Sequence, residues 1–244
     1  MSGIGMIQKR LEDRIAKQSQ VSESSGKEIW LKDGDQLFMK AIATGDENDI
    51  YLHEFHIYEF QQGADKGWRS VLVIDGEPVD AVPSEAMYWD DQPDKRRAPK
   101  HKFALWGYVT EILHPNKRDE SWDEITSRSG VKMYRESVND FKVLTLSFGA
   151  RNTNFYQFSD IYDENGSLNK NIIRIKRRGS NLDTTYTITT TKEVIDIPEN
   201  KASEIKNLTP MSEYVEQRYG KSTSDTSVPD NAVSTEDDDD DMPF

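Results

Sequence analysis

Seven short runs of strand-forming residues constrain what this chain can fold into. They are rich in β-branched and aromatic residues and span residues 36–44, 50–60, 68–74, 103–113, 141–148, 172–178 and 184–192. Turn-forming residues separate them, as at Asp33-Gly34, Asp75-Gly76 and Gly179-Ser180-Asn181. Short strands with this spacing favour a β-barrel or sandwich over a parallel sheet. The sequence therefore predicts a mainly β core.

The runs lie in the middle of a chain of 244 residues, which we divide into three regions. Residues 1–26 begin with a predicted basic helix and end in a linker rich in Ser and Gln. The apolar stripe of that helix comprises Ile4, Ile7, Leu11 and Ile15, and its basic residues are Lys9, Arg10, Arg14 and Lys17. Residues 27–220 form the predicted core domain, with helices expected at 152–162 and after Thr209-Pro210, where Thr209 is the expected N-cap. Residues 221–244 form a tail.

The tail is rich in Ser, Thr and Asp and ends in an acidic run with an apolar tip. The run and the tip are Asp237, Asp238, Asp239, Asp240, Asp241, Met242, Pro243 and Phe244. Adjacent carboxylates repel one another and bury little apolar surface, so the tail is predicted to be disordered. A terminal Phe is suited to fill an apolar pocket while basic residues around that pocket receive the carboxylates. We therefore interpret the tip as a ligand for a partner protein.

The net charge of −13 opposes binding to a polyanion such as nucleic acid. Residues 221–244 contain eight acidic residues and one lysine, so they account for −7 and leave −6 for residues 1–220. Binding would therefore depend on local basic clusters. The first cluster comprises Lys95, Arg96, Arg97, Lys100 and Lys102, with His101 among them, and the second comprises Lys170, Arg174, Lys176, Arg177 and Arg178.

Alternation along the run 103–113 predicts which of its aromatic side chains point outward. Successive residues of a strand point to opposite faces, so Trp106 and Tyr108 lie opposite Phe103 and Leu105. Because Phe103 and Leu105 are natural core residues, we predict that the Trp106 and Tyr108 rings face outward and stack on bases. The alternative is that both rings pack in the core.

The same alternation in 172–178 predicts a row of three cations. Arg174, Lys176 and Arg178 share one face, opposite Ile173 and Ile175. Such a row is suited to neutralise the phosphates of one nucleic-acid strand. The alternative is a solvated edge strand, since basic side chains prevent pairing between sheet edges.

Three segments resemble single-stranded-DNA-binding proteins, two of them those of phages. The stretch from Gly166, GSLNKNIIRIKRRGSNLDTTYTI, is similar to their basic strand, Gly-containing turn and Leu-Asp-Thr-x-Tyr strand. The stretch HKFALWGYVTEIL resembles their aromatic strand, and the end DDDDDMPF is similar to the tip of bacterial single-stranded-DNA-binding proteins, with Met242 where those usually carry Ile. The resemblance covers roughly residues 28–195 and the tip. It implies an oligonucleotide-binding-like (OB-fold) barrel with a few flanking helices.

Metal binding is not expected from these patterns. Many phage proteins of this kind hold zinc with pairs of cysteines before the aromatic strand, but this chain has no cysteine. The corresponding residues 79–102 offer only His101, so we carry over no zinc site and expect no cofactor. His53 and His56 would point to opposite faces of one strand, which argues against one metal ion between them.

Signatures of enzymes are weak as well. Asp75, Glu77 and Asp80 follow a predicted strand, and we interpret them as an acidic turn rather than a Mg²⁺ site. The sequence contains no Walker-type glycine-rich loop and no GxSxG elbow. We therefore expect a binding protein and not an enzyme.

Together these patterns predict a protein that coats single-stranded DNA in phage replication, recombination or repair with little base preference. Residues 237–244 would recruit a replication polymerase, helicase or primase, and the N-terminal helix would contact neighbouring copies. Two alternatives stay open: an acidic-tailed adaptor or chaperone, and an RNA-binding regulator. The lack of a long apolar run and of a signal-peptide pattern predicts a soluble protein in the cytoplasm, that of the bacterial host if a phage encodes it.

Overall fold

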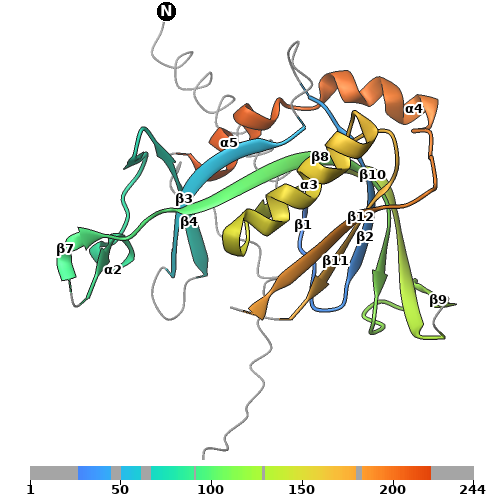
Figure 1. Ribbon diagram of the computed structural model, residues 1–244, viewed down its shortest axis with the longest axis horizontal. Helices are drawn as coiled ribbons and strands as arrows, with labels where there is room; N and C mark the ends of the chain where they lie inside the picture. Colours follow the sequence, from blue (N-terminus) through green and yellow to red (C-terminus); the bar gives the residue numbers. More distant parts are fainter. Residues whose placement is uncertain are drawn as a thin grey trace, which may run out of the picture.

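The computed structural model describes most of the predicted core domain (Figure 1). The described residues are 27–44, 51–61, 67–90, 92–127, 130–179 and 183–220. They form a mainly β fold with a few helices, as predicted. The expected N-terminal helix and linker in 1–26 and the acidic tail in 221–244 lie outside the described residues. No helix in the described part is long and apolar enough to cross a membrane.

Strand β8 (Lys100–His114) is the centre of the main sheet. Strand β10 (Lys132–Ser147) pairs antiparallel along one edge of β8. On the other edge, β2 (Gln36–Ile42) pairs with the second half of β8 and β3 (His53–Gln61) pairs with its first residues. Because β8 is 15 residues long, it accommodates β2 and β3 one after the other along the same edge.

Two branches of strands extend from β2 and β3. On the first branch, β2 is followed by β11 (Ile173–Arg178) and β12 (Thr185–Thr190). On the second, β3 is followed by β4 (Trp68–Ile74) and β5 (Glu77–Pro78). The short strands β1 (Glu28–Ile29) and β9 (Asp123–Thr126) pair with β10. Pairing among the described strands gives an open, branched sheet and does not close a barrel.

A small two-stranded sheet lies apart from the main sheet, at one end of the molecule (Figure 1). It consists of β6 (Tyr88–Trp89) and β7 (Gln92–Arg96) and follows the short helix α2 (Ser84–Met87). The chain enters β8 directly after this hairpin.

Both predicted core helices are present. Helix α3 (Thr153–Asn165) follows the 3₁₀ turn η1 (Ala150–Asn152) and ends at Gly166, whose φ of 73° is a left-handed conformation that glycine adopts without steric cost. Helix α5 (Met211–Tyr219) follows α4 (Glu199–Ala202) and the 3₁₀ helix η3 (Ser203–Asn207). Pro210, rather than the predicted Thr209, occupies the N-cap position of α5, and no side chain caps this helix.

The sheet buries side chains on both of its faces. On one face, Phe158 of α3 packs with Leu37 of β2 and Phe103 of β8. On the other face, Tyr214 of α5 packs in a second cluster with Trp106 of β8. A strand buried on both faces is continuously apolar in sequence rather than alternating, and the segment FALWGYV of β8 has this pattern.

A buried ionic network joins the end of β8 to the residue before β2. His114 Nδ1 lies 2.9 Å from Asp35 Oδ1 and its Nε2 lies 3.0 Å from Glu136 Oε2, so each ring nitrogen faces a carboxylate that can accept a hydrogen bond from the imidazolium. Arg118 Nη2 donates to Asp35 Oδ1 at 3.0 Å, and the Trp122 ring stacks on His114 with 3.9 Å between centroids. Burial alone would lower the pKa of His114, but the hydrogen bonds to Asp35 and Glu136 outweigh it and raise this pKa above its ordinary value.

We expect His114→Gln to lower the free energy of unfolding by about 2 kcal/mol near pH 6, because hydrogen bonds to a charged group are lost. The folded-state pKa of His114 lies above the ordinary 6.5. The imidazolium therefore stabilises the folded state in full below pH 6.5, and this stabilisation is lost as pH rises through the folded-state pKa. The difference between wild type and variant should therefore shrink as pH rises above 6.5. Urea unfolding of both proteins across this range measures it, and a difference that grows with pH would contradict the assignment.

Candidate nucleic-acid interface

Trp106 and Tyr108, which were predicted to face outward, are buried, with exposed fractions of 1% and 3%. The Trp106 indole nitrogen donates to the Thr209 carbonyl at 2.9 Å, and its ring meets that of Tyr214 with 5.6 Å between centroids. The Tyr108 ring packs against Phe141 with 5.5 Å between centroids. The prediction of an outward stacking pair is therefore wrong, because β8 is covered on this face by the chain around α5 and by the side chains of β10.

The three cations of β11 lie where alternation placed them. Arg174, Lys176 and Arg178 occupy the face opposite Ile173 and Ile175, both of which are fully buried. Arg178 is exposed, and Arg174 and Lys176 are half-buried. No ion pair joins these three cations to a carboxylate of the described residues. Their charge is therefore not neutralised by neighbouring acids within the described chain.

The remaining members of the second predicted cluster are placed differently. Arg177 points to the other face of β11, where its guanidinium donates to the carbonyl of Leu31 and Nη2 lies 3.4 Å from the Thr184 hydroxyl. Lys170 is exposed in the loop that precedes β11. The cluster of five basic residues is therefore reduced to a row of three on one surface.

Neighbouring strands extend the surface that carries this row. In the register of the sheet, Thr189, Thr187 and Thr185 of β12 lie opposite the three cations, and all three threonines are exposed. Residues directly opposite one another in paired strands share a face. On the other side of β11, Phe38 and Gln36 of β2 lie opposite Arg174 and Lys176 and therefore share this face. We call the complete set the β11 face: Gln36, Phe38, Arg174, Lys176, Arg178, Thr185, Thr187 and Thr189.

Phe38 contributes an aromatic ring to the β11 face. The Arg174 guanidinium lies 6.0 Å from the centroid of this half-buried ring. The guanidinium is held in place because Arg174 Nη2 and Nε donate to Gln36 Oε1 at 2.6 and 3.1 Å. Phe38 was not among the predicted binding residues, although alternation with the buried Leu37 and Met39 places it on the same face as Gln36.

Helix α3 covers the opposite side of this branch of the sheet. Its Gln157 accepts a hydrogen bond from the Ile188 N–H at 2.7 Å and donates to the Tyr186 carbonyl at 3.2 Å. These bonds satisfy backbone groups of β12 that would otherwise be free at the edge of the sheet. The β11 face itself lies on the side of the sheet away from α3, where no described helix packs over the three threonines.

Carboxylates neutralise most of the first predicted cluster. Arg96 donates to both oxygens of Glu77, at 2.9 and 3.1 Å, and Lys100 and Lys102 both contact Glu59. Burial opposes ionisation of Glu59, but Lys102 and Lys100 outweigh it and lower the pKa of this carboxyl. These three side chains of the cluster are therefore paired with carboxylates of the protein itself.

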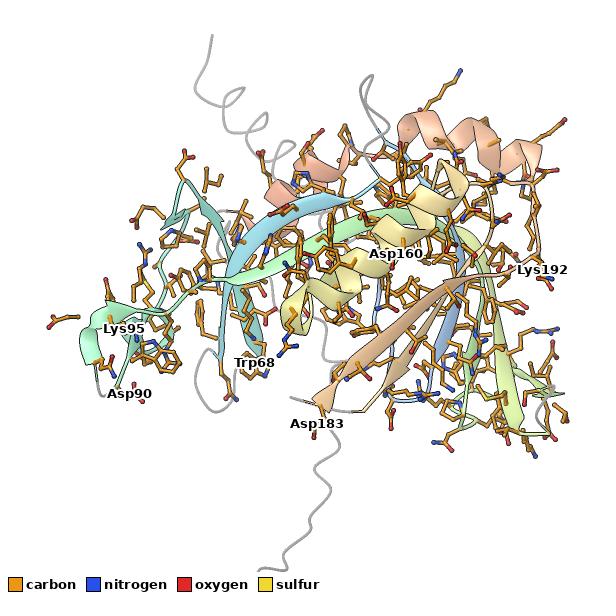
Figure 2. The ribbon with its side chains drawn as sticks, viewed as in Figure 1. Trp68, Asp90, Lys95, Asp160, Asp183 and Lys192 are labelled. Carbon is orange, nitrogen blue, oxygen red and sulfur yellow. The ribbon has the colours of Figure 1, made fainter. Side chains whose placement is uncertain are left out.

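Lys95 and Arg97 complete the first cluster. Lys95 is exposed and forms no ion pair with the described residues, whereas Arg97 Nη2 lies 3.8 Å from Asp90 Oδ1. The Arg97 guanidinium also lies 4.7 Å from the ring of the exposed Trp89. Figure 2 places Lys95 and Asp90 at one end of the molecule and Asp183, beside β12, far from them. The two basic clusters therefore do not form one continuous surface.

Comparisons with protein families, with curated proteins and with solved structures found no match to this chain. The choice between the two clusters therefore depends on their own chemistry. The β11 face combines an aromatic ring and exposed hydroxyl groups with cations that have no acidic partner in the described part of the chain, and we select it as the candidate interface.

We expect Trp106→Ala to lower the free energy of unfolding by about 3 to 5 kcal/mol, because it removes a buried ring and leaves the Thr209 carbonyl without its donor. Trp89→Ala is the matched control, since this tryptophan is 46% exposed, and should change stability by less than about 0.5 kcal/mol. Urea unfolding followed by circular dichroism measures both. A Trp106→Ala protein with wild-type stability and weakened DNA binding would show that the ring faces outward after all.

Proposed function

We propose that this protein binds single-stranded DNA across the β11 face and coats exposed strands with little base preference. The observation that carries the proposal is the row Arg174, Lys176 and Arg178, which has no acidic partner among the described residues and lies beside Phe38. Binding of one nucleic-acid strand requires cations that neutralise phosphates and aromatic rings on which bases stack. The β11 face offers both on adjacent strands.

The spacing of Arg174, Lys176 and Arg178 along β11 supports binding of an extended nucleic-acid strand. Alternate residues of a β-strand are about 7 Å apart, which is of the same order as the spacing of phosphates in an extended single strand. Each of the three cations is therefore suited to contact a successive phosphate. A DNA duplex presents a different arrangement of phosphates and keeps its bases stacked inside, so we expect it to bind more weakly.

Low base preference follows from the kind of group on the β11 face. Cations and threonine hydroxyls bind phosphate and sugar, and such contacts carry no direct sequence information. Stacking on an aromatic ring also tolerates all bases, because every base has a π-face. In its described residues the β11 face has one amide side chain, Gln36, and its Oε1 already accepts from Arg174.

We further propose that the sheet is related to the oligonucleotide-binding barrels implied by the sequence resemblance. OB-folds are partly open barrels that bind oligonucleotides on one face of their strands. Two features support this proposal: an antiparallel arrangement of β11, β2 and β8, and the long curved course of β8 shared by three other strands (Figure 1). The residues that resemble the phage proteins, GSLNKNIIRIKRRGSNLDTTYTI and HKFALWGYVTEIL, contain β11 and most of β12 and β8.

The terminal segments complete the proposal. Residues 237–244 would recruit a replication polymerase, helicase or primase, and the basic segment 1–26 would contact neighbouring copies on DNA. Capture of these enzymes by wild-type protein and by a chain lacking only Phe244 tests the first role. Loss of capture without Phe244 supports recruitment by the tip, and unchanged capture contradicts it.

The combined variant Arg174→Gln/Lys176→Gln/Arg178→Gln tests the β11 face. Each phosphate contact with a single strand contributes about 0.7 to the slope of log affinity against log salt concentration, so the slope should fall by about 2. Fluorescence anisotropy of labelled oligo(dT) over a series of NaCl concentrations measures this slope. Oligo(U) and a DNA duplex as ligands distinguish a DNA-binding from an RNA-binding protein.

The matched control replaces three exposed lysines elsewhere with Gln: Lys95, Lys117 and Lys206, which form no ion pair with the described residues. It changes the net charge by the same amount and should leave the salt slope close to that of wild type. An unchanged slope in the β11 variant, or an equal fall in both variants, would contradict binding at the β11 face.

Phe38→Leu tests base stacking separately from charge. It keeps an apolar side chain but removes the ring, so affinity for oligo(dT) should fall about fivefold to a hundredfold, the range expected for one stacked base, with no change in salt slope. Tyr156→Leu is the control, since this exposed tyrosine lies on α3 at the other side of the sheet. Full affinity in a folded Phe38→Leu protein would exclude stacking at this position.

A further inference from the structure

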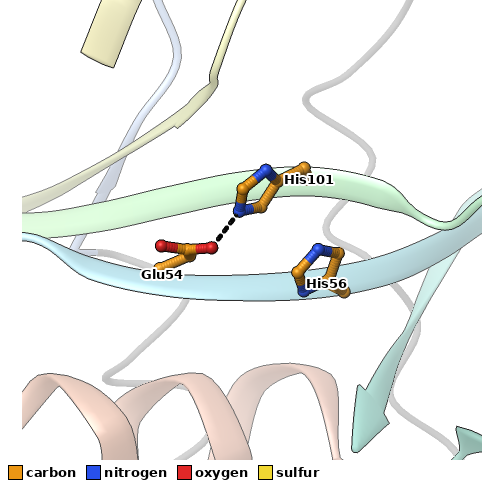
Figure 3. A group of neighbouring side chains, drawn as sticks. All are labelled: Glu54, His56 and His101. Carbon is orange, nitrogen blue, oxygen red and sulfur yellow. Dashed lines mark hydrogen bonds and ion pairs between the residues drawn. The ribbon is translucent and has the colours of Figure 1, made fainter. Parts of the chain in front are cut away.

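Glu54, His56 and His101 bring three metal-binding groups together on strands β3 and β8 (Figure 3). Each residue offers one ligand atom, and the three atoms lie within 4.8 Å of one another. His101 Nε2 is hydrogen bonded to Glu54 Oε1, and the rings of His56 and His101 stack with 4.3 Å between centroids. The group lies away from the β11 face, on the other branch of the sheet.

Strand register explains why these residues meet. His56 lies directly opposite His101, and Glu54 lies opposite Phe103, which places it diagonally across from His101. Directly opposite residues have Cβ atoms about 4.5 to 5.5 Å apart, and diagonal neighbours are within reach of long side chains. His53 points to the other face of β3, as predicted, so His56 meets its partner across the sheet and not along its own strand.

Packing holds one of the three ligands in place and leaves another free to move. The Phe148 ring stacks on His101 with 3.6 Å between centroids, and His56 stacks on the other side of the same ring. The side chain of Glu54 is 57% exposed, so it can rotate without disturbing the core. The His101 side chain is 33% exposed, which gives an ion a route from solvent.

We propose that Glu54, His56 and His101 bind a divalent transition-metal ion, with Zn²⁺ as the preferred ion. Two imidazoles and one carboxylate form a known zinc donor set, and three protein ligands leave a fourth position for water or an external ligand. Two ligand atoms on a tetrahedral zinc ion lie about 3.4 Å apart, so the side chains need to approach one another by up to about 1.4 Å. Because an imidazole binds a metal in its ring plane and the two rings are nearly parallel, the His56 ring also needs to turn toward the ion. The ion would fasten β3 to the start of β8, directly after the β6–β7 hairpin.

Isothermal titration of the full-length, chelator-treated protein with ZnCl₂ tests the site. We expect one saturable ion per chain, with affinity reduced at least about tenfold in His56→Gln, His101→Gln and Glu54→Gln. His53→Gln is the matched control, because it removes a histidine from the same strand but from the other face, and it should bind as wild type does. Co²⁺ in place of Zn²⁺ should give visible absorption bands that the same three variants lose.

Thermal unfolding gives a second readout that does not depend on the titration. Zinc at 100 times its Kd should multiply the folded-to-unfolded ratio about a hundredfold, which corresponds to a rise in Tm of about 5 to 10 °C in wild type and in His53→Gln. Mg²⁺ should not reproduce this rise. Glu54→Gln alters an exposed side chain, so it tests the site even if His101→Gln fails to fold.

Two results would overturn the proposal. Wild-type protein that shows no saturable zinc binding would mean that the three residues form only a hydrogen-bonded surface group. Zinc binding of equal affinity in wild type and in Glu54→Gln and His56→Gln would place the ion elsewhere, for example on Asp237–Asp241.

Discussion

Burial of strand β8 on both faces is the constraint on which the rest of the structure depends. β2, β3 and β10 all pair with β8, so its position fixes both branches of the sheet. Core residues of α3 pack over one face of this strand, and those of α5 pack over the other. The network of Asp35, His114 and Arg118 then fastens the end of β8 to the residue before β2. The two branches that extend from this buried centre carry the candidate sites.

The two basic clusters of this acidic protein differ in how far nearby carboxylates offset their positive charge. At the 95–102 cluster, Glu59 and Glu77 offset the charge of three cations, so that surface offers little net attraction to phosphate. Along β11 the cations have no such partners among the described residues, and the neighbouring side chains are neutral. A negatively charged chain can therefore still present one local surface suited to a polyanion.

Local patterns predicted the core strands β2, β3, β4, β8, β11 and β12 and the helices α3 and α5, because alternation and turn residues act over a few positions. They missed the first half of β10 and the short elements α2, β6, β7, β9 and α4. They also assigned Arg174, Lys176 and Arg178 to the correct face of β11, since Ile173 and Ile175 identify the buried face of this strand. The same reasoning failed for Trp106, because its cover comes from Thr209 and α5, about a hundred residues later in the chain. The ion pairs of Lys100 and Lys102 with Glu59 and the meeting of His56 with His101 were equally out of reach, because both depend on tertiary pairing of β3 with β8.

Photo-crosslinking of oligo(dT) to the full-length protein, with the attached peptides identified by mass spectrometry, tests the central claim most directly. Bases that stack on the β11 face should crosslink to Phe38 and to peptides that contain residues 174–178 and 185–189, and excess unlabelled oligo(dT) should suppress these products. Crosslinks confined to Trp89 and residues 95–102, with none on β2, β11 or β12, would contradict it. That result would place the DNA on the β6–β7 hairpin at the other end of the molecule.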